Sequence, residues 1–481
     1  MQLPPCCSSF KYFMAFEIDI APRMPARHSA ASRSALLIST AVASLAGFLF
    51  GYDNIVVSGA IGYLAAYYRL SAMTVGWAAA CALVGCLFGS AVSGLLADKF
   101  GLKKALYGCS ACFALSGLGV WAAGSFEQYI AFRILGGIGI GAASIVAPMY
   151  IAEISPAAVR GRLVILYQLG IVLGILAAVS VNTMIQNAGT PAWNTQTGWR
   201  WMFAVAGVPA ILFALTIALS YESPRWLMKV GRVAEAQTVL ALINGPQTAA
   251  EEGRAIRGAL SEEKGSWGEL LSSAVRPALV VGFVLAAFSQ TSGITALLSF
   301  LPEIFKTAGQ KSSDTFFQSV LVGIVNLLFT VLAIVLVDRA GRKTLILTGT
   351  ATQTVALASA GALYSTGGHG LAVLLGVMLF VAGHAIGNGA VCWVIISEIF
   401  PNKIRGAAMS VAITAIWIFA YLANQFFPSM QEHFGPSGTF FFFSLMAALN
   451  FLYVWTAVPE TKGYSLEEIG RIWLQSGDRR R

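Results

Sequence analysis

Two ionisable residues, Asp53 and Arg133, lie inside long stretches of the sequence that are otherwise almost free of charge. A charged side chain removed from water is costly, so it is expected to have a function or a partner. An aspartate beside an arginine can carry a proton, because protonation cancels the carboxylate charge, releases the arginine and changes the stability of one conformation. The same two residues can also form a static ion pair that joins two helices.

A set of amide and indole side chains lies in the same apolar stretches. Amides hydrogen-bond to the hydroxyl groups of a polyhydroxylated ligand, and aromatic faces stack on its C–H surface. The residues of this kind are Gln168, Gln290, Asn326, Trp393 and Trp417. Each of them can instead serve hydrogen bonding or aromatic packing between helices.

The composition indicates which elements hold these side chains. Of 481 residues, 57% are hydrophobic and 11% are charged, whereas roughly a quarter of a soluble chain is charged. The uncharged stretches are about 20 residues long, enough for a helix to cross a hydrocarbon core of about 30 Å. We therefore predict an all-α integral membrane protein with twelve transmembrane helices, at residues 36–60, 74–96, 105–124, 128–151, 162–186, 201–220, 277–304, 315–337, 343–365, 371–396, 404–428 and 438–458.

A long polar interruption separates six of these helices from the other six. We predict five parts: an N-terminal cytoplasmic tail that is expected to be disordered, a six-helix bundle, a cytoplasmic linker with short amphipathic helices, a second six-helix bundle and a C-terminal cytoplasmic tail, at residues 1–35, 36–220, 221–276, 277–458 and 459–481. The first tail has no clean secretory signal, and Met24 is an alternative start.

The basic residues predict the orientation. With both termini and the linker in the cytoplasm, 26 of the 31 Lys and Arg residues fall on that side, as is usual for cytoplasmic loops. This predicts a multi-pass protein of the cell membrane, inner or plasma, and we expect a monomer. The basic residues are spread over separate segments, so we expect no nucleic-acid partner.

Three motifs of the first half recur in the second half, in the same order and at nearly equal offsets: 98–101 as 338–341, 153–156 as 398–401, and 222–225 as 460–462. Such a repeat predicts two parallel bundles with a solute site between them. The charged residues of these motifs lie at predicted cytoplasmic helix ends, and a network among them could favour one conformational state. They are Asp98, Glu153, Arg160, Glu222, Arg225, Asp338, Arg339, Arg342, Glu398, Arg405 and Glu460. The alternative is that they only keep the loops soluble.

These motifs together resemble the sugar porter family of the major facilitator superfamily. The resemblance runs from about residue 36 to 470 and includes Phe50-Gly-Tyr-Asp53, Pro148-Met-Tyr-Ile-Ala-Glu153, Glu222-Ser-Pro-Arg225, Ser397-Glu-Ile-Phe-Pro401 and Pro459-Glu-Thr-Lys-Gly463. It implies the major facilitator fold of two pseudo-symmetric bundles, and proton coupling at Asp53 with Arg133. It also implies a substrate site lined by Phe50, Gln168, Gln290, Thr295, Asn326, Gly389, Trp393 and Trp417.

The seventh predicted helix departs from the family pattern. The family has a Gln-Gln pair, then Gly-Ile-Asn, then paired tyrosines, where this chain has Ser289-Gln290, Gly293-Ile294-Thr295 and Ser299-Phe300. Apolar residues, Ile175 and Ile416, also stand where the family has polar ones. A site for a fully hydroxylated ring would leave some hydroxyls unpaired, which costs affinity. A smaller or less hydroxylated solute fits this reduced polarity as well.

We therefore interpret the chain as a secondary active transporter that imports a monosaccharide or similar polyol with protons, by alternating access. The alternatives are a proton-independent uniporter, a carrier of a cyclitol or hydroxy acid, and a transporter-like receptor. The sequence has no phosphate-binding loop and no set of catalytic side chains, so we expect neither an ATP-driven pump nor an enzyme, and no cofactor or metal. His384 can titrate within the membrane or be a packing residue.

Overall fold

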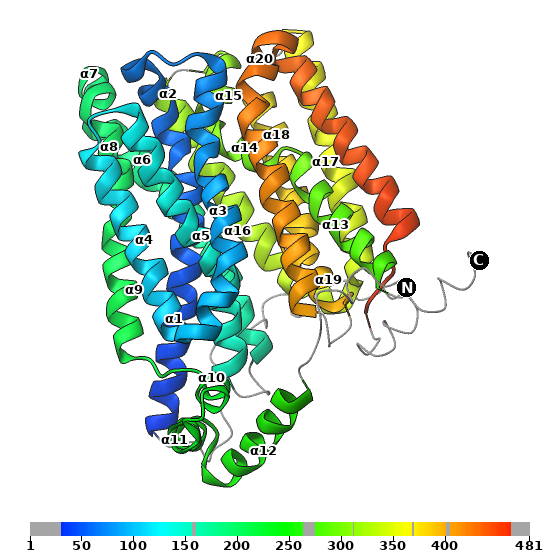
Figure 1. The fold of residues 1–481 in the computed structure, drawn as a ribbon. Helices are drawn as coiled ribbons and strands as arrows, with labels where there is room; N and C mark the ends of the chain where they lie inside the picture. Colours follow the sequence, from blue (N-terminus) through cyan, green and yellow to red (C-terminus); the bar gives the residue numbers. More distant parts are fainter. Residues whose placement is uncertain are drawn as a thin grey trace, which may run out of the picture.

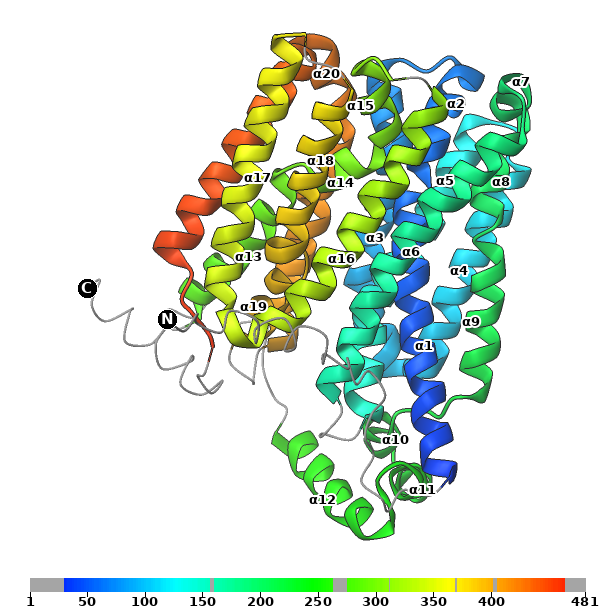
Figure 2. The ribbon, with the colours of Figure 1, turned by 180° about the vertical axis from the view of Figure 1, so that it is seen from behind.

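The computed structural model describes residues 30–155, 160–262, 275–310, 312–367, 370–400 and 405–462. Every regular element in these ranges is a helix. Two bundles stand side by side, and the short linker helices lie at one end of the first bundle (Figures 1 and 2). We call that end of the molecule the linker side.

The first bundle contains the helices before the linker. They are α1 (Ala30–Ile55), α2 (Val57–Tyr68), α3 (Ala72–Phe100), α4 (Leu102–Ala122), α5 (Phe126–Ile154), α6 (Arg160–Ala188), α7 (Pro191–Trp193), η1 (Asn194–Gly198), α8 (Trp199–Ala204) and α9 (Gly207–Leu219). The backbone stays helical through Val56, so α1 and α2 form one spanning helix. The last four elements form another, from Pro191 to Leu219.

The second bundle follows the linker helices α10 (Pro224–Lys229), α11 (Val233–Asn244) and α12 (Pro246–Glu262). Its elements are α13 (Arg276–Thr291), α14 (Ile294–Ser299), α15 (Leu301–Thr307), α16 (Ser312–Ala340), α17 (Arg342–Ser365), α18 (Leu371–His384), η3 (Ala385–Gly389), α19 (Val391–Glu398) and α20 (Arg405–Ala457). The elements η1 and η3 are single π-helical turns.

The described helices provide the twelve predicted crossings. Ten are long and apolar enough to span a membrane. One of these, α20, reverses at Gly435 (φ 67°, ψ 173°) and therefore supplies two crossings. The twelfth is α17, which is less apolar because of its threonines but has 24 residues, enough to cross a hydrocarbon core of about 30 Å.

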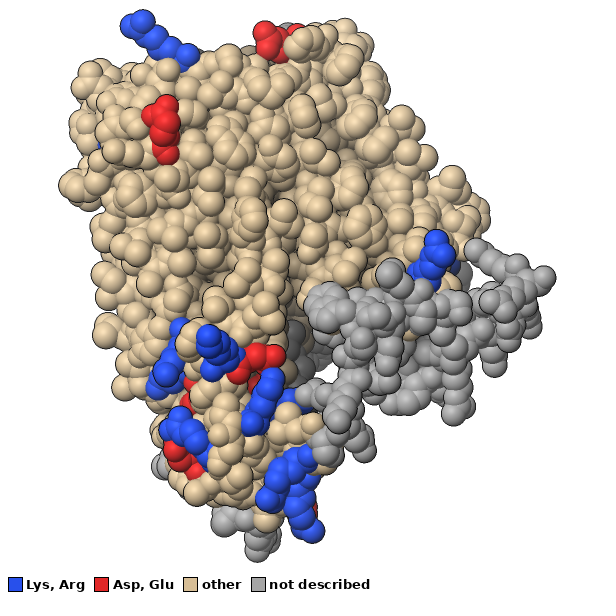
Figure 3. Space-filling model, in the orientation of Figure 1, with Lys and Arg blue, Asp and Glu red and all other residues tan. Residues whose placement is uncertain are grey.

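The surface agrees with a membrane location. On the face shown in Figure 3, basic and acidic side chains gather on the linker side and a few lie at the other end, with an uncharged band between. Large apolar side chains of the spanning helices are exposed, among them Leu95, Val208 and Leu371. Such a surface suits contact with lipid, where every main-chain group must be bonded inside its own helix.

Glycines allow α3 and α5 to approach each other closely. A Cβ atom on Gly137 would lie 1.8 Å from the main-chain oxygen of Ala82, and one on Gly85 would lie 2.1 Å from that of Ile134. Neither site has room for a methyl group. The Gly-x-x-x-Gly pairs at 85–89 and 137–141 pack against each other, as this motif does between membrane helices.

The two bundles meet at the end opposite the linker side. There Gln425 Nε2 of α20 donates to the main-chain oxygen of Met73 in α3 at 3.0 Å. Nearby, Thr183 Oγ1 of α6 donates to the main-chain oxygen of Phe316 in α16 at 3.2 Å. These contacts close one end of the interface between the bundles.

Candidate functional site

The first part of the candidate site is a buried ion pair between α1 and α5. Arg133 Nη1 donates to Asp53 Oδ2 at 2.9 Å, and Arg133 Nη2 donates to the main-chain oxygen of Asp53 at 3.1 Å. The side chains of Arg133 and Asp53 are only 1% and 3% exposed. The guanidinium also lies over the ring of Phe203, with Cζ 5.1 Å from the ring centroid. The two residues that the sequence singled out are thus in direct contact.

A small polar environment surrounds the Asp53 carboxylate. A Cβ atom placed on Gly136 would lie 3.1 Å from Asp53 Oδ2 and 2.4 Å from Ser116 Oγ, so the carboxylate and the hydroxyl of α4 both border Gly136. Ser116 Oγ and Arg133 Nε are both buried and have no hydrogen-bond partner among the described residues. Unpaired buried donors are costly.

Aromatic residues mark the interface between the bundles. Phe50 of α1 contacts Trp417 of α20, with ring centroids 5.8 Å apart and an interplanar angle of 54°. Trp393 of α19 packs against two apolar clusters, one within the second bundle and one that joins residues of the first bundle to Trp417 of α20. These rings therefore lie where a solute between the two halves would meet them.

A break in the seventh spanning helix brings Thr295 back onto Gln290. Helix α13 ends at Thr291, and Gly293 adopts a left-handed conformation (φ 81°) before α14 begins. Thr295 Oγ1 then donates to Gln290 Oε1 at 2.7 Å. A Cβ atom on Gly293 would lie 2.7 Å from the ring of Phe443, so the position needs glycine for both its φ angle and its space.

The remaining predicted binding residues are less closely joined. Asn326 is buried in α16, one turn from Gly323, which packs against Leu176 of α6. Gln168 is partly exposed in α6, and Gly389 ends the π-helical turn η3. No hydrogen bond or ring contact within the described part of the chain joins Gln168, Asn326 or Gly389 to the other predicted binding residues.

The apolar replacements noted in the sequence form packing contacts. Phe300 stacks on Phe427 of α20, with ring centroids 5.1 Å apart and an interplanar angle of 15°. Ile416 is buried in the core of the second bundle beside Trp417 in sequence, and Ile175 packs against an apolar cluster that contains residues of both bundles. These positions therefore offer packing where the family pattern offers hydrogen bonds.

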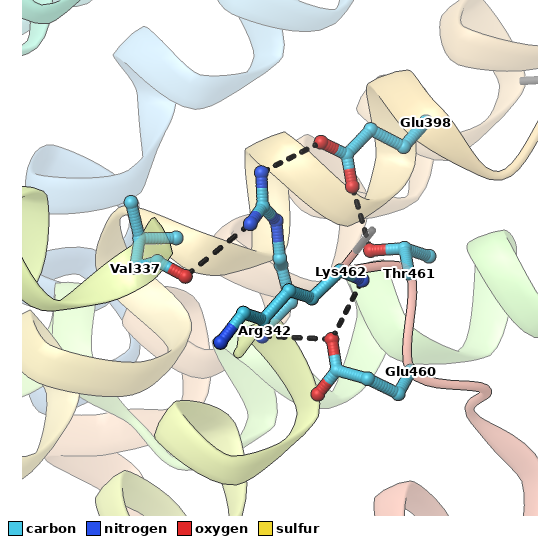
Figure 4. A network of polar contacts seen from close by, with 6 residues as sticks. All are labelled: Val337, Arg342, Glu398, Glu460, Thr461 and Lys462. Atoms are coloured by element: carbon cyan, nitrogen blue, oxygen red, sulfur yellow. Dashed lines mark hydrogen bonds and ion pairs between the residues drawn. The ribbon is translucent and has the colours of Figure 1, made fainter. Parts of the chain in front are cut away.

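A network of polar contacts lies at the linker side of the second bundle (Figure 4). Glu398 accepts from Arg342 Nη2 at 3.2 Å and from Thr461 Oγ1 at 2.6 Å. Glu460 accepts from the main-chain N–H groups of Arg342 at 3.0 Å and Lys343 at 3.1 Å. Glu460 thereby caps the first turn of α17, where an anion is favourable.

The first bundle repeats this arrangement. Glu153 accepts a hydrogen bond from Ser223 Oγ, as Glu398 does from Thr461. Glu222 accepts from the main-chain N–H of Lys103 at 3.1 Å, as Glu460 does from that of Lys343. The internal repeat of the sequence is thus repeated in individual hydrogen bonds.

Two further contacts complete these clusters. Lys229 Nζ forms an exposed ion pair with Asp98 at 2.8 Å, and Lys462 Nζ donates to the main-chain oxygen of Arg339 at 2.6 Å. Each hydrogen bond and ion pair named for these two clusters therefore lies within one bundle and the segment that follows it.

The sequence predicted arginine side chains as the partners of these carboxylates and missed the hydroxyl and main-chain donors. The repeat contained a usable signal, because Ser223 and Thr461 each follow an equivalent glutamate, and Lys103 and Lys343 follow equivalent glycines. No equivalent position in the repeat pointed to Lys229 as the partner of Asp98. The side chains of Arg160, Asp338 and Arg405 lie outside the described part of the structure, and Arg225 is electrostatically coupled to Glu153.

Comparisons with known proteins agree with this architecture. The model of a family described as "Sugar (and other) transporter" matches residues 39–473. The chain is 39% identical over 459 residues to an arabinose-proton symporter of Bacillus subtilis (strain 168), covering 95% of this chain and 99% of that protein. It is 37% identical over 466 residues to a D-xylose-proton symporter of Escherichia coli (strain K12), covering 90% and 95%.

Solved structures with the same fold include two of the xylose transporter XylE, the first of them from E. coli. A partially occluded inward-open form has a TM-score of 0.82 and 35% identity, covering 90% of this chain and 100% of that one. A form bound to 6-bromo-6-deoxy-D-glucose has a TM-score of 0.78 and 36% identity, covering 92% and 100%.

Proposed function

Since the chain belongs to the sugar porter family of the major facilitator superfamily, we propose that it imports a monosaccharide or a similar polyol together with protons. It is a membrane transporter and not an enzyme. The single observation that carries the proton part of the proposal is the buried contact between Asp53 and Arg133. Such a pair is costly inside a membrane unless it has a function.

In the proposed cycle Asp53 takes up a proton from the outer side. Protonation removes the negative charge that Arg133 Nη1 binds, while the bond from Nη2 to the main-chain oxygen of Asp53 can remain. The arginine is then free to change part of its contacts, which alters the stability of one conformation relative to the other. Release of the proton on the cytoplasmic side restores the pair.

The solute binds between the two bundles in this proposal. Gln168, Gln290 and Asn326 provide amide groups for hydroxyls, and Phe50, Trp393 and Trp417 provide aromatic faces for the C–H surface of a ring. Thr295 and Gly389 complete the lining. The contact between Phe50 and Trp417 supports this placement, because the two rings come from different bundles.

The polar clusters at the linker side are proposed to stabilise the cytoplasmic ends of the two bundles during the rocking motion. We propose that this side and both termini are cytoplasmic, because most basic residues of the sequence lie there under that orientation. Each chain carries both bundles, and therefore a complete site, so we propose that it acts as a monomer in a cell membrane.

A reconstituted transport assay tests the proposal. Purified protein in liposomes is given radiolabelled pentoses, hexoses, inositols and hydroxy acids, with and without an inward proton gradient. We expect one sugar to accumulate against its gradient only when the proton gradient is imposed. Equal uptake under both conditions would instead establish a uniporter.

A second candidate substrate class rests on the replaced polar residues. Thr295 Oγ1 already donates to Gln290, and Phe300 and Ile416 pack against apolar neighbours, so these positions leave fewer groups for ligand hydroxyls. A cyclitol or hydroxy acid would need fewer hydrogen bonds there. Accumulation of such a solute, with no uptake of sugars, would assign the protein to that class within the same fold.

A further inference from the structure

We propose that His384 is a specificity-determining residue of the central site, where its imidazole hydrogen-bonds to a hydroxyl group of the transported solute beside Gly389. The proposal rests on the proposed function, because it assumes that a hydroxylated solute binds between the bundles. It adds a residue that neither the sequence motifs nor the resemblance to the family assigns to binding.

The π-helical turn η3 places the imidazole at Gly389. In an α-helix of 3.6 residues per turn, residues five apart differ by about 140° around the axis. A π-turn, with its i→i+5 hydrogen bonding, brings such residues close together, and these turns are frequent at functional sites. Here η3 runs from Ala385 to Gly389, directly after His384. A Cβ atom on Gly389 would lie 3.3 Å from His384 Cδ2 and 3.5 Å from Nε2.

This side of the helix faces the interior of the protein. The lipid-exposed side of α18 carries Leu371, Leu375 and Leu379, which are 66%, 56% and 47% exposed. His384 follows Leu375 by nine residues, which turns it about 180° away from that side. Toward the linker side, Trp393 lies one turn after Gly389 and packs against the apolar cluster that joins residues of the first bundle to Trp417 of α20. The imidazole therefore lies on the side of the helix that is turned away from lipid.

The imidazole also has unused hydrogen-bonding capacity. A neutral imidazole has one N–H donor and one acceptor nitrogen, and buried polar atoms are normally hydrogen-bonded. His384 Nδ1 is buried and has no partner among the described residues, while the side chain as a whole is partly exposed. With Nδ1 unprotonated, Nε2–H is a free donor next to Gly389. This donor compensates in part for the hydrogen bonds to ligand hydroxyls that Thr295 and Ile416 do not supply.

The test compares His384→Leu with His384→Asn in liposomes, using D-xylose and L-arabinose as probes. We expect His384→Leu to raise the KM for exchange of the transported probe about tenfold, because one hydrogen bond to the solute is lost. The maximal rate should stay within about twofold of the wild type. His384→Asn, whose amide can donate and accept, should recover most of this loss. The matched control is His433→Leu, because His433 is exposed and bonds only to Ser429 within its own helix among the described residues.

A series of monodeoxy forms of the transported probe separates recognition from stability. The wild type should discriminate against one of these sugars about tenfold, and His384→Leu should accept that sugar and the parent equally. An unchanged KM and unchanged discrimination in folded His384→Leu would overturn the role of His384 and leave the proposed function intact. If another sugar or polyol of the transport panel is the one transported, it replaces the probes, and a wild type that transports no sugar or polyol of that panel would overturn both proposals.

Discussion

Arg133 binds Asp53 at two different atoms, one in the side chain and one in the main chain. The Nη1 bond to Oδ2 is 2.9 Å long and depends on the carboxylate charge, whereas the Nη2 bond to the main-chain oxygen is 3.1 Å long and does not. A change in the protonation of Asp53 therefore weakens one bond and keeps the other. The arginine can respond to the proton while it remains attached to α1.

The first prediction concerns Asp53→Asn, which keeps the shape of the side chain and removes its charge. We expect this variant to lose accumulation of solute against its gradient while exchange across the membrane persists, because binding and rocking remain but no proton can be carried. The measurement is counterflow beside gradient-driven uptake in the same liposomes. Uphill accumulation by the variant would contradict a proton role for Asp53.

The second prediction concerns the cost of a lone buried charge. Arg133→Met leaves the Asp53 carboxylate without its partner, and removal of one member of a buried pair typically costs about 3–5 kcal/mol of stability. We expect a lower Tm in detergent for Arg133→Met and a partial recovery in the double variant with Asp53→Asn. A double variant no more stable than Arg133→Met would show that pairing is not the reason for the loss.

The sequence predicted the arrangement of the helices well because it depends on long, additive signals. Twenty apolar residues in succession have few alternatives to a spanning helix. The repeat around Asp98 and Asp338 indicates in addition that the two halves have the same arrangement of helices. The buried pair was also predictable, since only two ionisable residues stood out within the spans and each needs a partner. These signals do not require knowledge of any single contact.

Local backbone irregularities were not predictable in the same way. The π-turn that ends at Gly389 lies where Gly387 packs against Gly349 of α17, and the break at Gly293 lies against the ring of Phe443, so both depend on residues that are distant in sequence. The ring contact between Phe50 and Trp417 likewise depends on how the two bundles come together. Hydrophobic pattern determines which segments are helical, but tertiary packing determines where a helix is deformed.

The third prediction concerns the equivalent carboxylates Glu222 and Glu460. Each accepts from main-chain N–H groups in the first turn of a spanning helix, at Lys103 of α4 and at Arg342 and Lys343 of α17. We expect Glu222→Ala and Glu460→Ala each to cost about 1–2 kcal/mol of stability, and the glutamine variants to cost less. Thermal unfolding in detergent measures this, and unchanged Tm values in both alanine variants would contradict the capping role.

The fourth prediction concerns the close approach of α3 and α5. A methyl group on Gly137 would lie 1.8 Å from the main-chain oxygen of Ala82, which no side-chain rotation can relieve, so Gly137→Ala should lower the yield of folded protein severely. The matched control is Gly108→Ala in α4, because a Cβ atom there has nothing within 4 Å. Size-exclusion chromatography in detergent compares the two. Equal yields would show that the helices can separate at little cost.

The fifth prediction concerns the contact between the bundles at the end opposite the linker side. A Cβ atom on Gly76 of α3 would lie 2.0 Å from the main-chain oxygen of Gln425 in α20, whose amide also donates to the main-chain oxygen of Met73. A leucine at position 76 therefore cannot be accommodated while this end is closed. We expect Gly76→Leu to shift the population toward the conformation in which this end is open, and so to slow transport while solute still binds from that side.

Spin labels placed at that end on α3 and α20 measure the shift directly, because the distance between them reports whether the end is open. A change from an almost fully closed to an almost fully open population requires about 5.5 kcal/mol, and a clash with main-chain atoms is large enough to supply it. Gly94→Leu, in the same helix but with nothing within 4 Å of its Cβ position, is the matched control and should leave the distance unchanged. If Gly76→Leu also leaves it unchanged, the leucine is accommodated while this end stays closed, and the contact at Gly76 does not control the opening of this end.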